Sequence, residues 1–494
     1  MIQLHYVTCM FFRFYTRKDD KMAKRIFIDL CDEKSGVTGT CQLFNAYFPG
    51  KSLGANGPTN EIPFIFDCGS FQGEDNEEDL NASFKFDIAK PEFGILSHAH
   101  FDHYGRYPLA IKNGFQAPIF TTYVTKTFLS QLFLDDCLKI EMRAAKKKGI
   151  EPLYSELDSQ KMREFMVGCA YQKRIQYNDN ISIFFFDNGH VPGAAVTLIQ
   201  LSYPGYEEIN IVVSGDYNDH NMFFKVNPLP EWVYNLKNVI IIIESTYGTT
   251  KLSDLSPACF IKYVVQALKQ GNTVLVPSFS FGRQQEIDYT LKEAQDTNIL
   301  PLRYSIYNDG KSAIGCTNLF LQGTFNMYPH TRDFLPQNLT FVEGKEFRYS
   351  LINDPSPKVV VASSGMCSHG PSSTYLSRLA LNPKVTIIAP GYVSPNSKLG
   401  KLRDSDDAVA ELLSTDEFSA HGKLEVLKAF IKPFKRENVK AIGVTHGNPE
   451  VRVDFVKDLE DTFGIPTFNI TSDYIYRLTS DGLVQKFERK TESK

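Results

Sequence analysis

The chain has 494 residues, more than one core usually accommodates, so two domains or one domain with a large insert are expected. Its composition, 43% hydrophobic and 22% charged, excludes a disordered chain. The net charge of −4 counts against RNA or DNA held only by bulk attraction, although it leaves room for a local basic channel.

Targeting and redox signals point to the cytoplasm. No apolar run approaches the roughly 20 residues that span a bilayer, and residues 1–10 lack the pattern of a signal peptide. The nine cysteines are scattered and form no Cys-x-x-Cys pair, which indicates reduced thiols and not a disulfide framework or a thiolate zinc site. We therefore expect a cytoplasmic protein with no membrane association.

In chain order, residues 1–21 are interpreted as an N-terminal extension, either flexible or an upstream start. Short β-branched runs then predict buried strands, which are Ile62–Phe66, Phe93–Leu96, Ile181–Phe186, Ile209–Val213, Val239–Ile243, Thr273–Val276, Val359–Val361, Val385–Ile388 and Ala441–Val444. Helical patterns lie between many of them, most clearly Ser256–Lys269, which has a serine cap, Pro257 in its first turn and Gly271 after its end. Strands that alternate with helices predict a layered α/β fold.

Residues with chemical potential directly follow these strands. They are Asp67, His98, His190, Asp216, Glu244 and His446, one after each of six strand runs. In layered α/β folds the loops at the carboxyl ends of strands form the site. The sequence therefore predicts that six distant segments converge.

The segment from Ser97 to His103 is the strongest local motif. His98, His100, Asp102 and His103 place four potential metal ligands within six residues, and three of the ten histidines of the chain lie here. A lone histidine is more often a surface or satisfied core residue, but this density favours a site for zinc, manganese or iron. Two adjacent cations suit displacement at a phosphodiester and equally suit ester, lactam or thioester hydrolysis.

The motif His98–His103, together with His190 and Asp216, resembles the metallo-β-lactamase fold. Further motifs resemble its β-CASP nucleic-acid branch, and the similarity runs from about residue 36 to about residue 469. These motifs are Glu244-Ser-Thr-Tyr-Gly, Phe281-Gly-Arg-Gln-Gln-Glu, Ser364-Gly365-Met366, Phe418-Ser-Ala-His421-Gly and Val444-Thr-His446-Gly-Asn. The nearest likeness is to messenger-RNA 3′-end cleavage endonucleases and their short prokaryotic relatives.

The resemblance implies an αββα metallo-β-lactamase sandwich with an inserted β-CASP α/β domain. The expected boundaries are 22–248 and 402–494 for the sandwich and 249–401 for the insert.

The resemblance also implies the ligands of two Zn²⁺ ions, with Mn²⁺ as an alternative. One ion would be held by His98, His100, His190 and Asp216, and the other by Asp102, His103, Asp216 and His446. Asp67 would support the metal-binding loop, although by itself it reads equally well as a turn-capping aspartate. His421 would act as general acid with Glu244 orienting it, and Asp102 is also counted as catalytic. Without the resemblance, His421 reads as a solvent-exposed residue before a helix.

Substrate expectations follow from the same resemblance. Histidine at position 446 is typical of members that act on RNA. Arg283, Arg378, Ser364 and Gly365 are predicted to contact the substrate, with Gly370 opening a helix whose N-terminus suits an anion. Exposed arginines more often only solvate a surface.

We expect a two-metal ribonuclease that binds RNA. A small-molecule hydrolase, a DNA nuclease and a non-catalytic RNA-binding scaffold are kept as alternatives. A homodimer, the choice between endonuclease and 5′-exonuclease, the RNA sequence preference and the physiological metal stay open.

Overall fold

The computed structural model describes residues 25–34, 36–49, 60–72, 77–252, 259–391, 393–405 and 408–489. The predicted extension at 1–21 and the predicted helix cap at Ser256 and Pro257 lie outside these ranges. Within them, no helix combines the length and the apolar character that a bilayer crossing requires.

The first sheet has eight strands. Their order is β21 (Gly482–Glu488), β20 (Tyr474–Thr479), β1 (Phe27–Asp32), β2 (Gln42–Phe48), β3 (Asn60–Phe66), β4 (Phe93–Ile95), β5 (Ile119–Thr122) and β6 (Met166–Cys169). The strands β20, β1, β2 and β3 pair antiparallel, whereas β3 to β6 pair parallel. The carboxyl ends of β3 and β4 therefore lie side by side.

The second sheet has seven strands. Their order is β19 (Thr467–Asn469), β18 (Val439–Val444), β11 (Val239–Ile243), β10 (Ile209–Val213), β9 (Ala195–Leu201), β8 (Ile181–Asp187) and β7 (Ile175–Gln176). β18, β11 and β10 are parallel, and β8 runs in the same direction because β9 is antiparallel to both of its neighbours. Four of the six strand runs that precede a predicted site residue thus end at one edge of this sheet, as expected for them from the sequence.

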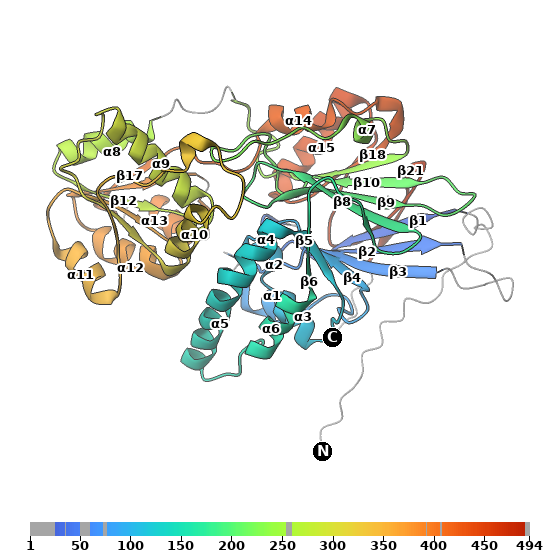
Figure 1. Cartoon of the computed structure of the whole chain (residues 1–494), viewed down its shortest axis with the longest axis horizontal. Coiled ribbons are helices and arrows are strands. Elements are labelled where there is room, and N and C mark those ends of the chain that lie inside the picture. Colours follow the sequence, from blue (N-terminus) through green and yellow to red (C-terminus); the bar gives the residue numbers. More distant parts are fainter. Residues whose placement is uncertain are drawn as a thin grey trace, which may run out of the picture.

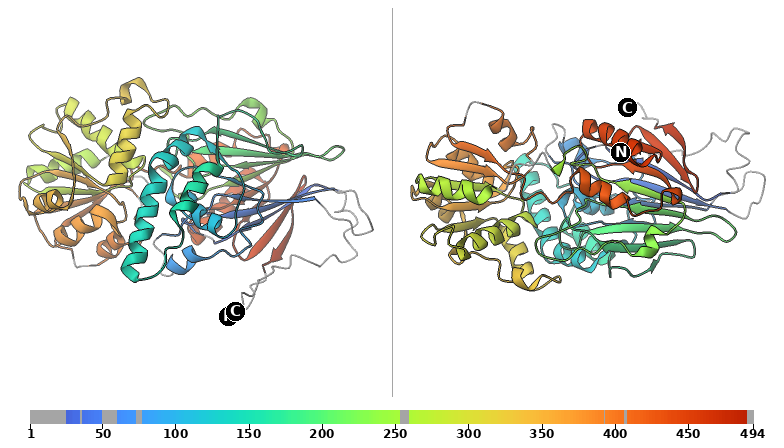
Figure 2. Two further views of the ribbon diagram at one scale, coloured as in Figure 1. Left: turned by 60° about the horizontal axis from the view of Figure 1, so that its bottom comes forward. Right: turned by 90° about the horizontal axis from the view of Figure 1, so that it is seen from above.

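The two sheets pack face to face with helices outside both (Figures 1 and 2). Phe44 and Phe64 of the first sheet share a buried cluster with Ile199 and Ile211 of the second. The first sheet is covered by α1 (Glu77–Ala82), α2 (Phe101–Tyr104), α3 (Tyr107–Lys112), α4 (Tyr123–Phe128), a π-helical turn (Leu129–Phe133), α5 (Leu134–Lys148) and α6 (Glu156–Phe165). The second is covered by α7 (Glu231–Tyr234), α14 (Leu424–Ile431) and α15 (Pro449–Phe463), with a 3₁₀ turn at Arg436–Asn438. This confirms the αββα sandwich.

A third sheet forms the inserted domain beside the sandwich (Figure 1). Its six parallel strands are ordered β14 (Leu339–Phe341), β13 (Ile306–Asp309), β15 (Val359–Ala362), β12 (Thr273–Pro277), β16 (Val385–Ala389) and β17 (Glu411–Ser414). One face packs on α8 (Phe260–Lys269) and α9 (Arg283–Asp296), and the other on α11 (Lys345–Asn353), α12 (Gly370–Leu379) and α13 (Lys398–Arg403). The helix α10 (Lys311–Leu321) and a 3₁₀ turn (Pro329–Thr331) complete the insert.

Two details of the insert bear on the sequence predictions. The helix expected up to Lys269 is present as α8, and its predicted apolar face of Phe260, Val264, Ala267 and Leu268 is buried. β17 follows residue 401 in the chain, yet it pairs with β16, so the third sheet continues past the expected boundary. The short run Glu411–Ser414 is only half-buried and carries too little apolar pattern to be recognised from sequence.

Aromatic rings join the insert to the sandwich. The ring of Phe281, which precedes α9, lies 4.5 Å from Phe128 and 5.4 Å from Phe133 of the sandwich, between ring centroids. Phe320 of α10 joins the same buried cluster. A hydrophobic contact of this kind restricts motion between domains, and it fixes the insert over the strand ends that carry the predicted site.

Candidate metal centre

The predicted ligands converge from both sheets. One potential ligand atom from each of His98, His100 and His190 lies within 4.8 Å of the other two, and the same holds for Asp102, His103 and His446. His98 Nε2 and His190 Nε2 approach His100 Nδ1 at 3.0 and 2.9 Å. Three imidazole nitrogens that face so small a volume form a donor set that one cation can satisfy.

Asp216 lies between the two groups. Its Oδ2 is 3.6 Å from His190 Nε2 and 3.2 Å from His103 Nε2. Its Oδ1 is 3.4 Å from His446 Nδ1. One carboxylate therefore reaches both sets of nitrogens, which is the arrangement that a bridging ligand of two cations needs.

Asp67 fixes the orientation of the metal-binding loop. Its Oδ1 accepts a hydrogen bond from the Ser97 backbone N–H at 2.7 Å, and its Oδ2 accepts from Ser97 Oγ at 2.8 Å and from His103 Nδ1 at 2.7 Å. Asp67 adopts a left-handed backbone conformation with φ 58°, which is rare outside glycine and is retained where the surroundings enforce it. The contact holds His103 with Nε2 facing the site.

Gly69 shows why the turn after β3 needs a residue without a side chain. A Cβ at this position would lie 1.5 Å from the Asp102 carbonyl oxygen. The backbone of Cys68 also donates to the His103 carbonyl at 2.7 Å. The segment Asp67-Cys68-Gly69 is therefore pressed against the metal-binding loop.

Burial sets the protonation of His98, His100 and His190, the first group of ligands. Burial, reinforced by the neighbouring imidazoles, lowers the pKa of His98, and burial lowers the pKa of His100 to about 4 and that of His190 well below its usual value. These rings are neutral at physiological pH and present free lone pairs. His190 Nδ1 donates to the Ala420 carbonyl at 3.0 Å, which leaves its Nε2 as the acceptor.

The second group, which consists of Asp102, His103 and His446, carries the negative charge together with the neighbouring Asp216. Burial opposes ionisation of His103, yet the carboxylates of Asp216 and Asp67 raise its pKa. Among the described residues, the buried atoms His103 Nε2 and His446 Nε2 lack hydrogen-bond partners. Orphaned buried nitrogens beside carboxylates are the donor set that zinc or a similar cation satisfies, so the residues fit the implied metals.

His421 and Glu244 form a pair at the border of this centre. His421 Nδ1 donates to both Glu244 oxygens, at 2.9 and 3.0 Å. Burial opposes the charged ring, but Glu244 raises the pKa of His421. The His421 side chain is 17% exposed and its Nε2 lies 4.0 Å from Asp216 Oδ2. This ring can therefore meet a substrate, whereas the imidazoles of His98, His103, His190 and His446 are at most 4% exposed.

Three of the four predicted substrate residues gather around the Phe279 ring. Arg283 Nε donates to the Phe418 carbonyl at 3.0 Å, and its guanidinium stacks 4.8 Å from the Phe279 ring. A Cβ on Gly365 would contact that same ring, so the Ser364-Gly365 turn lies beside it. Arg378 differs, because it is exposed in the last turn of α12, about 12 Å along the helix from Gly370.

The structure adds residues that sequence reasoning missed. Asn188 Nδ2 donates to the carbonyls of Ser214 and Asp216 at 2.9 and 2.7 Å, and its Oδ1 accepts from the His190 N–H at 2.9 Å. Asn188 thereby ties two ligand loops together. The Phe281 ring lies 5.7 Å from His100. Asn188 follows β8 directly, the same signal that identified His190.

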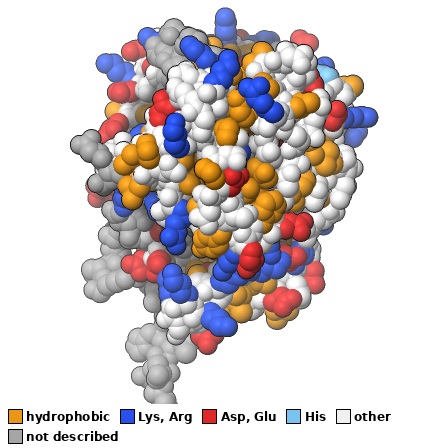
Figure 3. All heavy atoms as spheres, turned by 90° about the vertical axis from the view of Figure 1, so that its left-hand side faces the viewer, with side chains coloured by type: hydrophobic (Ala, Val, Ile, Leu, Met, Phe, Trp, Pro, Cys, Tyr) orange, Lys and Arg blue, Asp and Glu red, His pale blue; other side chains and the backbone are white. Residues whose placement is uncertain are grey.

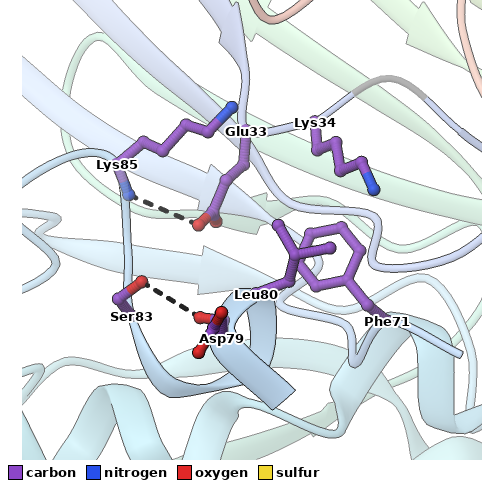
Figure 4. A pocket seen from close by; sticks show the side chains of 7 residues that line it. All are labelled: Glu33, Lys34, Phe71, Asp79, Leu80, Ser83 and Lys85. Atoms are coloured by element: carbon purple, nitrogen blue, oxygen red, sulfur yellow. Dashed lines mark hydrogen bonds between the residues drawn. The ribbon is translucent and has the colours of Figure 1, made fainter. Parts of the chain in front are cut away.

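Other parts of the surface give weaker indications of a functional site. A pocket beneath β1, lined by Glu33, Phe71, Leu80 and neighbouring residues, measures about 190 Å³, below the roughly 300 Å³ at which ligand pockets begin (Figure 4). On the outer face of the insert, basic and acidic side chains are interspersed (Figure 3). Neither feature competes with the metal centre.

Comparisons with known proteins agree with this geometry. The Beta-Casp domain family matches residues 284–401. The transcription termination factor FttA of Methanosarcina mazei is 25% identical over 85% of this chain and 68% of its own length. Ribonuclease TTHA0252 of Thermus thermophilus is 28% identical over 68% of this chain and 75% of its own, and the probable RNase MJ4 of Methanocaldococcus jannaschii is 28% identical over 81% and 91%. The chain therefore contains a β-CASP domain, inserted into an αββα sandwich of the metallo-β-lactamase fold that carries a His/Asp centre.

Proposed function

We propose that the protein is a two-metal ribonuclease that hydrolyses phosphodiester bonds in RNA. The observation that carries this proposal is the convergence of seven His and Asp side chains, with Asp216 among them at the centre and the Glu244–His421 pair at the border. The names of its relatives, which include a ribonuclease and a probable RNase, support RNA as substrate. Simple small-molecule hydrolases of this fold do not require an inserted domain.

The ligand sets follow the geometry. His98, His100, His190 and Asp216 would hold one cation, and Asp102, His103, Asp216 and His446 the other, with Zn²⁺ favoured by the nitrogen-rich donors and Mn²⁺ as the alternative. When bound, two such cations activate water and stabilise the charge that develops on the phosphate. Asp67 and Asn188 keep the ligands oriented.

His421 would handle the proton of the leaving oxygen. Glu244 accepts from its Nδ1, which holds the ring with Nε2 toward the centre, and its negative charge favours the protonated form. A protonated imidazole at this position can donate to the leaving oxygen as the phosphodiester bond breaks. The scissile phosphate would lie between the sandwich and the insert, next to Arg283.

We propose that the first domain boundary lies between residues 248 and 249, as predicted, and that the second lies beyond the predicted residue 401. The pairing of β17 with β16 supports moving the second boundary to about residue 414. Residues 1–21 are left as an extension.

The test compares three substrates on the zinc-loaded protein. A single-stranded RNA, a DNA of the same sequence and a small ester are incubated with the wild type and with His98→Ala. Cleavage of RNA alone, abolished in the variant together with metal content, supports the proposal. Cleavage of DNA alone or of the ester alone would overturn it, as would full activity after exhaustive chelation. Products of a 5′-labelled RNA separate the two modes of attack, since a labelled mononucleotide indicates a 5′-exonuclease and internal fragments an endonuclease.

A further inference from the structure

Lys423 carries a buried ammonium that the proposed chemistry does not use. The residue is 5% exposed, and within the described part of the chain its Nζ has no hydrogen-bond partner. The ammonium lies over the Tyr247 ring, 3.3 Å from the centroid. A cation without hydrogen bonds is unfavourable below the surface, and it is retained where it has a task. A methionine would fill the same space without this cost.

The backbone places Lys423 between the two loops of the Glu244–His421 pair. Lys423 forms a parallel bridge with Tyr247, three residues after Glu244. On either side, Gly422 N–H donates to the Tyr217 carbonyl at 2.6 Å and Leu424 N–H to the Thr250 carbonyl at 3.0 Å. The backbone of Lys423 is therefore fixed two residues from the proposed acid, His421.

Arg283, a second cation that belongs to the inserted domain, influences the Lys423 ammonium. Burial lowers the pKa of Lys423 to about 8, and the positive charge of Arg283 contributes in the same direction. The carboxylates of Asp416 and Glu244 oppose this, but within the described ranges no carboxylate oxygen comes within 4.0 Å of the ammonium. Two neighbouring cations repel each other, and an anion bound between them removes that repulsion.

The guanidinium is fixed in place. Arg283 is anchored by the Phe418 carbonyl and by the Phe279 ring. Gly391, with φ 150°, leaves room for it, since a Cβ there would lie 3.1 Å from the guanidinium carbon. The anchored Arg283 and Lys423 are complementary, because the guanidinium is held at a fixed place whereas the lysine has a flexible four-carbon stem.

We propose that Lys423 and Arg283 together form a subsite for a backbone phosphate of the bound RNA strand, adjacent to the bond that faces His421. This subsite rests on the proposed function, because it assumes an RNA substrate. It gives Lys423 a direct contact with the substrate. Lys423 was not among the site residues predicted from the sequence.

The test measures binding of a 5′-hydroxyl single-stranded RNA by fluorescence anisotropy at several salt concentrations. The 5′-hydroxyl excludes a terminal phosphate as the ligand. All proteins are zinc-loaded and carry His421→Gln to slow cleavage, and gels verify that the RNA stays intact. The variants are Lys423→Met, which keeps the apolar stem, Lys423→Arg, which keeps the charge, and Lys432→Met, an exposed lysine at the end of α14, as the matched control.

We expect Lys423→Met to raise the Kd several-fold and to make the slope of log Kd against log salt shallower by about 0.7, the loss of one phosphate contact on a single strand. Lys423→Arg and Lys432→Met should keep the slope. Because a purely structural role would not change the slope, this quantity separates the two roles. If Lys423→Met does not fold, Lys423→Gln repeats the measurement.

An unchanged Kd and slope in the neutral Lys423 variants, with tight binding by the reference protein, would overturn the subsite and leave the proposed function intact. A reference protein that binds no RNA at any salt concentration would overturn the proposed function, and the subsite with it.

Discussion

Asp67 Oδ2 accepts a hydrogen bond from His103 Nδ1 at 2.7 Å, and this contact decides which nitrogen of His103 faces Asp216. The same carboxylate also accepts from the backbone and the hydroxyl of Ser97, the residue before His98. A buried aspartate that is not itself in the proposed ligand sets therefore orients both sides of the metal-binding loop.

Replacing Asp67 by asparagine should weaken metal binding by about 10- to 100-fold. An amide has only one acceptor oxygen, so it cannot accept from the Ser97 backbone N–H as well as from Ser97 Oγ and His103 Nδ1, and the fixed arrangement of His103 and the loop is weakened. Asparagine tolerates the positive φ of this position. Competition with a zinc chelator measures the effect. Asp87→Asn, an exposed aspartate, is the control, and equal affinity in the wild type and Asp67→Asn would refute the role.

His446→Ala should reduce bound metal from two equivalents per chain to about one, because it removes a ligand of only one proposed ion. Elemental analysis after gel filtration gives the count, and circular dichroism verifies the fold. The exposed His330→Ala should retain both equivalents. Loss of both ions, or of neither, from His446→Ala would contradict the assignment of His446.

His421→Gln should lower kcat by about 100- to 10,000-fold, with KM and metal content unchanged, since general acid catalysis contributes factors of this size. An RNA whose leaving oxygen is replaced by sulfur needs no proton, so it should restore most of the rate in the variant. Glu244→Gln should also lower kcat, by a smaller factor, and the sulfur-containing RNA should restore its rate as well. A variant equally slow on both substrates would indicate that His421 serves another purpose.

Asp288→Asn should stabilise the protein at pH 8. Burial raises the pKa of Asp288 well above its usual value, and within the described residues its Oδ1 and the Oδ1 of Asn308 lack partners. A raised folded-state pKa means that this group's contribution to stability is present at low pH and is lost as the carboxyl ionises. The variant can accept from Asn308 through its oxygen and donate back through its amide, which should contribute about 1 to 3 kcal/mol.

Thermal unfolding of the wild type and of Asp288→Asn at pH 8 and pH 5 measures the difference in stability between the two proteins. The variant should unfold a few degrees higher at pH 8. The difference should shrink at pH 5, where the wild-type carboxyl is protonated. A variant that is less stable than the wild type at both pH values would show that the Asp288 carboxylate is ionised in the folded protein and stabilised by its surroundings.

The sequence alone determined the features whose cause is local. Four potential ligands fall within one short turn from His98 to His103, and buried strands such as Val239–Ile243 are continuous apolar runs that precede single polar residues. Because parallel strands end at one edge, these patterns predicted a layered α/β fold and the convergence of the site, whereas the αββα sandwich and the fold family followed from the resemblance of the motifs to a known family.

Only the tertiary structure decided the features that depend on neighbours distant in the chain. The orientation of His103 depends on Asp67, the unpaired state of Lys423 depends on Tyr247 and Arg283, and the place of β17 depends on β16. Arg378 and Arg283 look alike in sequence, yet of these two only Arg283 is anchored to the Phe418 carbonyl, three residues before His421. Burial and pairing arise from packing between segments, and no spacing along one segment encodes them.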